Sequence, residues 1–340
     1  MSMSLLLASA IAALIVSTLA TWAITPILKA RGIVDRPNDR SSHSSPVPRG
    51  GGIGLVFGIV AGGTIWSLGF SSWSLVPALL VIVAFAAVGL LDDLRDGLAP
   101  GTRLIAQLLI ATAAVWYMGP THLESTTVVT WATWTAVIIW IVGIVNITNF
   151  LDGIDGYAAT QAVWVGGAVA LIGIYRGSAV AAGVGAITAA AAIGFLRWNW
   201  HPARVFLGDV GSYALGAGFS VMALSGPEPP IRSMLLITML AWAFTADGIY
   251  TLMYRVIRGE APWTPHRQHL YQKLVRSGLS HSQVVRRLSF TALAPGLLSV
   301  MAILSGKSWL YFLGLIAGIL WLSTVLVVVH QRTRPTPARP

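Results

Sequence analysis

Long apolar runs separated by short polar connections repeat along the whole chain. A helix crosses a bilayer with roughly 17–25 mostly apolar residues, and eleven runs have about that length. We expect spans at about 4–28, 52–70, 74–91, 102–118, 128–149, 157–175, 179–197, 209–225, 232–254, 286–304 and 308–329. No run alternates apolar and polar residues with a period of two, as the strands of a membrane barrel do. The pattern predicts an all-α, polytopic integral membrane protein with about 11 transmembrane helices.

The composition agrees with this pattern and excludes a soluble protein. Of 340 residues, 55% are hydrophobic and only 10% are charged, whereas soluble domains carry about 25% charged residues. The chain has no cysteine, which excludes disulfides and thiolate chemistry. The first apolar run has no basic residue before it and is too long for the apolar part of a signal peptide, so we expect it to be retained as a span.

Basic residues predict the orientation, because cytoplasmic loops are enriched in Lys and Arg. With an external N-terminus and a cytoplasmic C-terminus, all basic residues except Arg176, Arg232 and Lys307 fall on the cytoplasmic side. The net charge of +10 is then explained by topology and by contact with anionic membrane lipid. Nucleic acid is not an expected partner.

Acidic residues gather on the same side, although the orientation rule does not require them there. Of 12 acidic residues, only Glu124 and Glu228 fall outside. The other ten are Asp35, Asp39, Asp92, Asp93, Asp96, Asp152, Asp155, Asp209, Asp247 and Glu260. Ionisable groups at a membrane boundary are costly and usually functional. The distribution therefore predicts a carboxylate-rich site on the cytoplasmic face.

The densest polar stretch is NITNFLDGIDG at residues 146–156, directly after an apolar run. Asn146, Asn149 and Asp152 are three residues apart, so on a helix they would lie near one face. A polar helix end followed by a turn explains the two glycines. It does not require two asparagines and two aspartates, so we interpret the stretch as part of a functional site.

Two further groups of acids lie at the ends of apolar runs. Asp92 and Asp93 end one run in LLDDLRD, and Asp209 begins another in VFLGDVGSYALG. Adjacent carboxylates repel unless a cation or a proton joins them, and Mg²⁺ is often held by one or two carboxylates together with substrate phosphates. A charged helix end would explain the pair, and a helix N-cap would explain Asp209. Their position on one side of the membrane favours a shared metal site.

Cationic side chains that suit phosphate lie on that side as well. Arg103 begins one helix, although an interfacial arginine would also explain it. In the longest cytoplasmic loop, PHRQH contains His266, Arg267 and His269, a dense set of donors for a diphosphate. Two histidines three residues apart also suit zinc, but no cysteine or HExxH accompanies them. Arg49 precedes three glycines in the first loop and is a weaker candidate for phosphate binding.

In this order and at cytoplasmic helix ends, LLDDLRD, NITNFLDGIDG, VFLGDVGSYALG and PHRQH resemble motifs of the polyprenyl-phosphate N-acetylhexosamine-1-phosphate transferases. That family includes phospho-MurNAc-pentapeptide translocase and the GlcNAc-1-phosphate transferases of cell-envelope synthesis. The resemblance covers about residues 30–275 and rests on all four motifs in register.

The resemblance implies a reaction, a cofactor and a location. A UDP-amino sugar would donate an N-acetylhexosamine 1-phosphate to undecaprenyl phosphate, releasing UMP, with Mg²⁺ (or Mn²⁺) as the cofactor. It implies a bacterial inner membrane protein with its active site on the cytoplasmic face, and it allows a homodimer. One transmembrane catalytic domain would span residues 1–330, with a substrate-binding loop at 255–285 and a basic tail at 331–340.

It also implies a role for each matching residue. Asp92, Asp93 and Asp209 match catalytic acids, and Asn149 and Asp209 match Mg²⁺ ligands. The expected substrate-binding residues are Asp96, Arg103, Asp152, Asp155, His266, Arg267 and His269. Asp92 or Asp93 would orient or deprotonate the lipid phosphate for a direct displacement, and a covalent carboxylate intermediate stays open.

The expected donor is UDP-GlcNAc or a 6-deoxy sugar such as UDP-FucNAc or UDP-QuiNAc. The product would start O-antigen or another cell-envelope polysaccharide. The loop reads HRQH where the pentapeptide translocase has HHH, which argues against a MurNAc-pentapeptide substrate.

Other classes of membrane protein compete with this interpretation. A secondary transporter should place its acids near the membrane midplane, in broken helices of internal repeats. A membrane prenyltransferase, to which the DDxxD pattern at 92–96 also points, should have a second Asp-rich motif. A scaffold protein leaves the acids on the cytoplasmic side unexplained.

Overall fold

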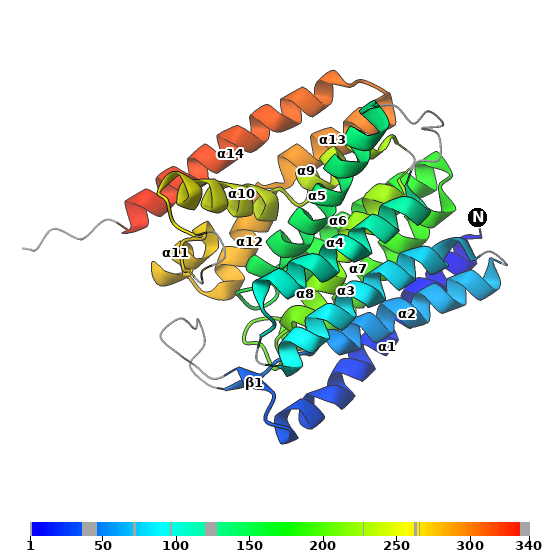
Figure 1. Cartoon of the computed structure of the whole chain (residues 1–340), viewed down its shortest axis with the longest axis horizontal. Coiled ribbons are helices and arrows are strands. Elements are labelled where there is room, and N and C mark those ends of the chain that lie inside the picture. The colour runs from blue at the N-terminus through cyan, green and yellow to red at the C-terminus, as the bar shows by residue number, and fades with distance from the viewer. Residues whose placement is uncertain are drawn as a thin grey trace, which may run out of the picture.

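The computed structural model describes residues 2–35, 46–70, 73–95, 97–119, 128–226, 228–261, 264 and 266–333, and almost all of its regular structure is helical (Figure 1). The first eight helices are α1 (Met3–Ala30), α2 (Gly52–Gly69), α3 (Val76–Leu94), α4 (Pro100–Met118), α5 (Val128–Phe150), α6 (Tyr157–Arg176), α7 (Ala179–Asn199) and α8 (Gly208–Leu224). They are followed by α9 (Pro230–Leu240), α10 (Trp242–Ile257), α11 (Leu270–Arg276), α12 (His281–Thr291), α13 (Leu293–Ser305) and α14 (Trp309–Thr333). A 3-10 turn, η1 (Trp73–Leu75), precedes α3, and the short strands β1 (Val34–Asp35) and β2 (Val47–Pro48) pair in antiparallel fashion.

The expected all-α membrane architecture is confirmed. In the described part of the chain, nine helices are long and apolar enough to cross a membrane, with α12 and α13 counted together. The number is ten if the bent pair of α9 and α10 forms one span. The remaining expected run forms α8, which has 17 residues and is almost wholly buried. The orientation of the termini stays a prediction.

The expected span at 232–254 is wrong as a single helix. α9 and α10 meet at Ala241 and are bent by 93°. α10 buries Asp247 and Arg255, whereas Ile249 and Val256 on its other side are exposed. Hydropathy averages over a run and cannot detect a change of direction. The bend lets the polar face of α10 pack on the protein while its apolar face stays outside.

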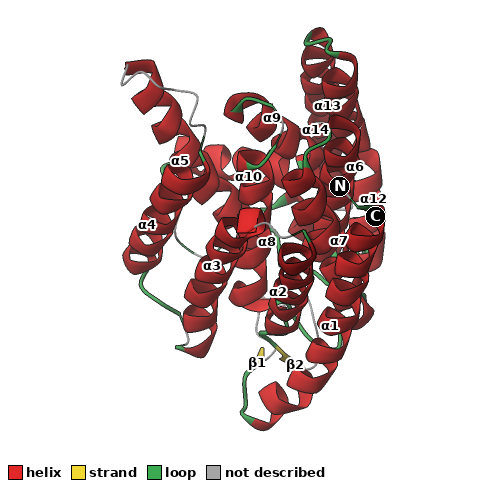
Figure 2. Cartoon of the chain, turned by 90° about the vertical axis from the view of Figure 1, so that its right-hand side faces the viewer, coloured by secondary structure: helices red, strands yellow, loops and turns green. Residues whose placement is uncertain are grey.

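α8 lies in the middle of the bundle (Figure 2) and contacts α2, α3, α5, α6, α7 and α9. Every residue from 210 to 223 is buried. Small residues allow this close packing: a Cβ on Gly216 would lie 2.6 Å from the Cα of Val145 in α5. The neighbours of α8 are therefore fixed in register against it.

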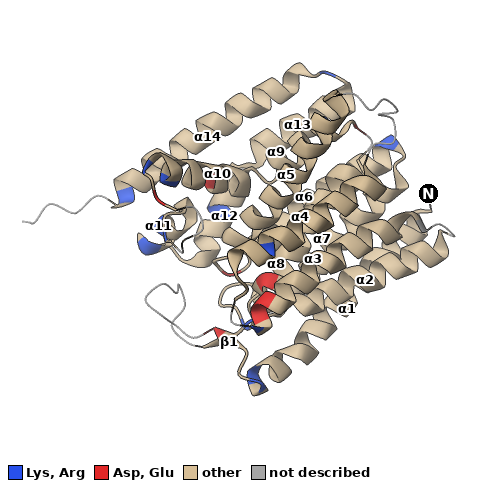
Figure 3. Ribbon diagram, viewed as in Figure 1, with Lys and Arg blue, Asp and Glu red and all other residues tan. Residues whose placement is uncertain are grey.

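Charged residues gather mainly at one end of the bundle, where β1 and α11 also lie (Figure 3). The last turns of α3 and α5 and the first turn of α8 meet at this end, joined by hydrogen bonds from Val210 to Asp93 and from Asn149 to Asp209. We call it the polar end. The packing around α8 thus brings three sequence-distant motifs to one place.

Candidate active site

Asp92, Asp93 and Asp209 come together where α3 meets α8, and we call them the acidic cluster. Gly89, one turn earlier in α3, permits this approach because a Cβ there would lie 2.7 Å from the backbone nitrogen of Val210. Asp93 is buried, and its Oδ2 accepts a hydrogen bond from the Val210 N–H at 3.0 Å. Asp92 is also buried, and its carboxyl group lies within hydrogen-bonding reach of Asp209. The three expected catalytic acids are therefore neighbours.

Two arginines partly neutralise the acidic cluster. Arg103 of α4 donates from Nη1 to Oδ2 of Asp92 at 2.9 Å, while Oδ1 of Asp92 accepts from the Leu98 N–H. Arg49 donates from Nη2 to the backbone carbonyl of Asp93 at 3.0 Å, and its Nε lies 3.8 Å from Oδ1 of that residue. Ionised carboxylates in contact repel one another. When all are ionised, three carboxylates and two guanidinium groups carry a net charge of −1, which a further cation would neutralise.

Asn149, at the end of α5, reaches the acidic cluster from a third helix. Its Nδ2 donates to Oδ1 of Asp209 at 2.7 Å and to Oγ of Ser212 at 3.0 Å. A 180° flip of the Asn149 side-chain amide exchanges its nitrogen and oxygen atoms, so the oxygen would then face Asp209 and Ser212. With Asp92, these residues offer the oxygen ligands that Mg²⁺ prefers. The donor set fits the expected metal, and the assignment itself stays a prediction.

Asp152 follows α5 in a half-buried position near the acidic cluster. Burial raises the pKa of Asp152 well above its ordinary value, and the negative charges of Asp209, Asp93 and Asp155 raise it further. The negative charges of these neighbouring carboxylates favour a bound cation at this point.

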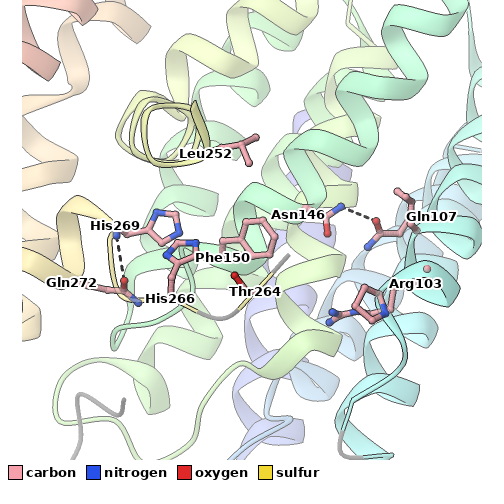
Figure 4. A pocket seen from close by; sticks show the side chains of 12 residues that line it. Arg103, Gln107, Asn146, Phe150, Leu252, Thr264, His266, His269 and Gln272 are labelled. Atoms are coloured by element: carbon pink, nitrogen blue, oxygen red, sulfur yellow. Dashed lines mark hydrogen bonds between the residues drawn. The ribbon is translucent and has the colours of Figure 1, made fainter. Parts of the chain in front are cut away.

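A cavity of about 770 Å³ opens beside the acidic cluster. Arg103 and Asn146 lie on one side of it, and His266 and His269 lie on the other (Figure 4). Phe150 and other apolar side chains line the space between these polar walls. A cavity with two polar walls and an apolar flank suits an amphiphile with an anionic head.

Asp247 of α10 holds His269 in its place on the cavity wall. The Asp247 carboxyl group is buried, and its Oδ1 lies 3.1 Å from Nδ1 of His269. It also accepts hydrogen bonds from the Leu270 and Tyr271 N–H groups at 2.9 and 3.1 Å and from Thr251 at 3.0 Å. The aspartate therefore caps α11 and fixes one imidazole nitrogen, which leaves the other for a ligand.

Arg255, two turns after Asp247 in α10, pairs with other residues. Its Nε lies 3.1 Å from Oε2 of Glu260, and its other donors bind the carbonyls of Thr264 and Ala261 at 2.9 and 2.7 Å. Arg255 thereby shapes the loop that carries the cavity histidines. Asp247 therefore pairs with His269 and not with Arg255.

Among the described residues, three expected substrate-binding residues do not line this cavity: Asp152, Asp155 and Arg267. The Nε and Nη2 atoms of Arg267 are buried without a hydrogen-bond partner among the described residues. Asp96 lies outside the described residues. Their roles stay predictions.

Asp155 has both carboxylate oxygens engaged by the chain itself. Oδ2 lies 2.6 Å from Nδ1 of His201 and accepts from the Ala203 N–H at 3.1 Å, while Oδ1 lies 3.2 Å from Nδ1 of His281. Burial alone would raise the pKa of Asp155, but the contacts with the two histidines outweigh it and lower the pKa. We call Asp155, His201 and His281 the histidine clasp.

The histidine clasp is the one group of three His, Asp or Glu residues in the described part whose ligand atoms lie within 4.8 Å of one another. Zinc bonds of about 2.0–2.1 Å at tetrahedral angles put two ligand atoms about 3.3 Å apart. The 2.6 Å contact with His201 is shorter than that. We therefore interpret the clasp as a hydrogen-bonded tie within the chain. Sequence spacing gave no hint of it, because His201 and His281 lie 46 and 126 residues from Asp155.

Comparisons with known proteins bear on the polar end. The model of glycosyl transferase family 4 matches residues 75–226, which include the acidic cluster and Asn149. The chain is 34% identical over 277 residues to phospho-N-acetylmuramoyl-pentapeptide-transferase of Synechococcus sp. (strain WH7803), covering 74% of each chain. It is 28% identical over 288 residues to a probable undecaprenyl-phosphate N-acetylglucosaminyl 1-phosphate transferase of Bacillus subtilis, covering 81% of this chain and 80% of the relative. It is also 28% identical over 310 residues to decaprenyl-phosphate N-acetylglucosaminephosphotransferase of Mycobacterium tuberculosis, covering 80% and 76%.

Proposed function

The chain belongs to glycosyl transferase family 4, and from this premise we propose that it transfers an N-acetylhexosamine 1-phosphate from a UDP-sugar to undecaprenyl phosphate. The phosphate oxygen of the lipid attacks the β-phosphorus of the donor. A new oxygen–phosphorus bond forms, the bond from the β-phosphorus to the bridging oxygen breaks, and UMP leaves. The product is a polyprenyl diphosphate sugar.

The cavity beside the acidic cluster is the observation that carries this proposal. Arg103 lines the cavity and also binds Asp92, so an anion in the cavity lies next to the acidic cluster. His266 and His269 supply donors from the opposite wall. The volume of about 770 Å³ falls within the usual range for small-molecule sites, about 300–1,000 Å³. A lipid phosphate and a sugar diphosphate together need this combination of cations and apolar surface.

Asp209 and Asn149, with Asp92, are the residues that would hold Mg²⁺, and Mn²⁺ offers the same charge. The bound ion would offset the negative charge of the diphosphate, which otherwise repels the lipid phosphate. Asp93 is committed to the start of α8 through the Val210 N–H. Asp92, which bonds to the cavity residue Arg103, is therefore the better candidate to orient or deprotonate the lipid phosphate.

The donor we propose is UDP-GlcNAc or a 6-deoxy-N-acetylhexosamine nucleotide. The names of the Bacillus and Mycobacterium relatives support an N-acetylglucosamine substrate. The loop sequence His-Arg-Gln-His, rather than three histidines, is our reason to disfavour a MurNAc-pentapeptide. We further propose that the active site faces the cytoplasm of a bacterial inner membrane and that the product starts O-antigen or another cell-envelope polysaccharide.

The competing classes are less well supported. The bend between α9 and α10 is a feature that transporters share, but Asp247 near this bend pairs with the cavity residue His269. A prenyltransferase would leave His266 and His269 without a task.

Purified protein in detergent with undecaprenyl phosphate, Mg²⁺ and a panel of UDP-N-acetylhexosamines tests the proposal, with UMP release as the readout. We expect release with at least one N-acetylhexosamine donor, dependence on the lipid phosphate, and loss of release when EDTA removes the metal. Donor-independent uptake into liposomes without lipid phosphate, with no UMP from any donor, would favour a transporter.

A further inference from the structure

A groove of about 470 Å³ lies between α6 and α12 at the polar end, separate from the cavity described above. Trp164 of α6, Trp200 after α7 and Phe290 of α12 are its aromatic walls, and Arg286 and Arg287 lie at its rim. None of the residues that line it lines the active-site cavity. It is therefore a second candidate site and not an extension of the first.

The walls of this groove lie about two helical turns from the polar end, at the depth where we expect a membrane interface. α6 begins at Tyr157 at the polar end, so Trp164 lies about 10 Å further along the helix at a rise of about 1.5 Å per residue. Trp164 and Phe290 are 43% and 73% exposed. Tryptophan is enriched where headgroups meet acyl chains. The groove therefore opens towards that boundary.

The two arginines at the rim lack the acidic partners that other arginines have. Arg286 and Arg287 are exposed, and within the described ranges no carboxylate pairs with either. At the other end of the bundle, Arg176 and Arg232 share Glu228, with N–O distances of 2.8 and 3.5 Å. Two consecutive arginines that both line the groove, and that no carboxylate of the described residues neutralises, are suited to an external anion.

We propose that the groove between α6 and α12 binds an anionic phospholipid. Its phosphate pairs with Arg286 and Arg287, and one acyl chain lies along Trp164 and Phe290. Charge complementarity selects a lipid over an uncharged ligand, because basic pockets between membrane helices bind anionic headgroups. The apolar walls select a lipid over free phosphate. The inference does not depend on the transferase reaction.

A lipid in this position would tie together elements that meet at the polar end. α12 begins at His281, which holds Asp155 in the histidine clasp. Trp200 lies next to His201 of the same clasp and packs close to Gly156, where an added Cβ would lie 3.0 Å from the indole ring. Binding should therefore raise the melting temperature of the protein as well as its lipid occupancy.

The test compares binding of phosphatidylglycerol and phosphatidylcholine to delipidated, full-length protein in detergent by native mass spectrometry. The double variant Arg286→Gln/Arg287→Gln is compared with Arg31→Gln/Arg276→Gln, which removes the same charge from exposed positions outside the groove. We expect wild type and the control to prefer phosphatidylglycerol, and the groove variant to bind it roughly tenfold more weakly. The melting temperature should rise with phosphatidylglycerol in the first two proteins only.

A second variant tests the apolar wall without altering charge. Phe290→Ala should weaken phosphatidylglycerol binding several-fold, because part of the acyl-chain contact is lost. Inorganic phosphate at the same concentration should not displace the lipid. Equal phosphatidylglycerol binding by both double variants would overturn the proposal. So would a wild-type dimer that the groove variant converts to a monomer, since a second copy of the chain would then be the occupant.

Discussion

Two sets of buried carboxylates lie at the polar end, and they differ in how completely the chain satisfies them. Asp92 accepts from Arg103 and from the Leu98 N–H, whereas the carboxyl group of Asp209, which lies against Asp92, accepts only from Asn149 among the described residues. Asp247 is saturated by His269, two backbone N–H groups and a hydroxyl, and Asp155 by two histidines and a backbone N–H. A saturated carboxylate stabilises the fold and positions its partners. An unsatisfied carboxylate that touches another one costs free energy unless a ligand completes it, so the shortage of partners, and not burial, distinguishes Asp209 from the positioning carboxylates.

The largest effect should come from Asp209→Asn, which removes a carboxylate from the unsatisfied set. UMP release should fall by roughly 10³-fold, equivalent to about 4 kcal/mol of transition-state stabilisation. The melting temperature without Mg²⁺ should rise or stay unchanged, because repulsion from Asp92 is relieved. The stabilisation that Mg²⁺ gives the wild type should be lost.

The matched control for that variant is Asp35→Asn in β1, which makes the same chemical change in the first loop away from the acidic cluster. It should leave both UMP release and the response to Mg²⁺ close to wild type. Near-normal turnover in Asp209→Asn would sink the metal assignment, and a lower melting temperature would contradict the view that the cluster is unsatisfied.

The sequence predicted the unsatisfied set better than the saturated one. Asn149 and Asp209 end and begin apolar runs, so their expected meeting at one end of the bundle follows from hydropathy and orientation. The carboxylates of Asp155 and Asp247 are saturated partly by His281 and His269. These histidines reach the carboxylates only once α12 and the loops have packed. No local pattern contains that information, because each pair joins separate elements.

The same limit applies to the fold. Apolar runs predicted where helices occur, since length and composition decide whether a segment suits a bilayer. They did not predict the bend at Ala241, because α9 and α10 form one continuous apolar run and the reason for the bend is the polar face of α10. Arg49, a weak candidate in the sequence, lies against Asp93 because β2 runs into the start of α2.

Asp247→Asn should act in the opposite direction on stability. One oxygen becomes an amide that cannot accept a hydrogen bond from Tyr271 or Leu270, so the protein should lose about 1–3 kcal/mol. UMP release should fall by roughly 10–100-fold, since His269 loses the partner that orients it. Thermal unfolding and steady-state kinetics measure the two effects.

A double-mutant cycle separates positioning from general damage. If Asp247 acts on the reaction through His269, Asp247→Asn should cost little further activity in a His269→Ala background, while the loss of stability remains. Full additivity of the two activity losses would mean that Asp247 does not act through the histidine.

Asp155→Asn should show the pH dependence of a saturated carboxylate. The folded pKa of Asp155 lies below its ordinary value of 3.8, so its contribution to stability is fully present above that value. It is lost as the pH falls through the lower, folded pKa. The melting temperature of the variant should therefore be below that of wild type at pH 7, and the gap should narrow in acid below about pH 4. A gap that is constant down to pH 3 would show that the ionised carboxylate is not what ties the clasp.

The smallest effect should come from Arg103→Lys, which tests whether the charge or the geometry of Arg103 matters to the acidic cluster. Lysine keeps the charge, so the cluster stays as neutral as before, but a single ammonium replaces a planar fork that binds Asp92 at 2.9 Å and also lines the cavity. We expect KM for undecaprenyl phosphate to rise about threefold with little change in kcat, whereas Arg103→Gln should lower kcat/KM by roughly 100-fold. The ratio of the two losses is the informative quantity. Equal losses would mean that geometry at Asp92 matters more than charge, and the acidic cluster would then belong with the saturated carboxylates.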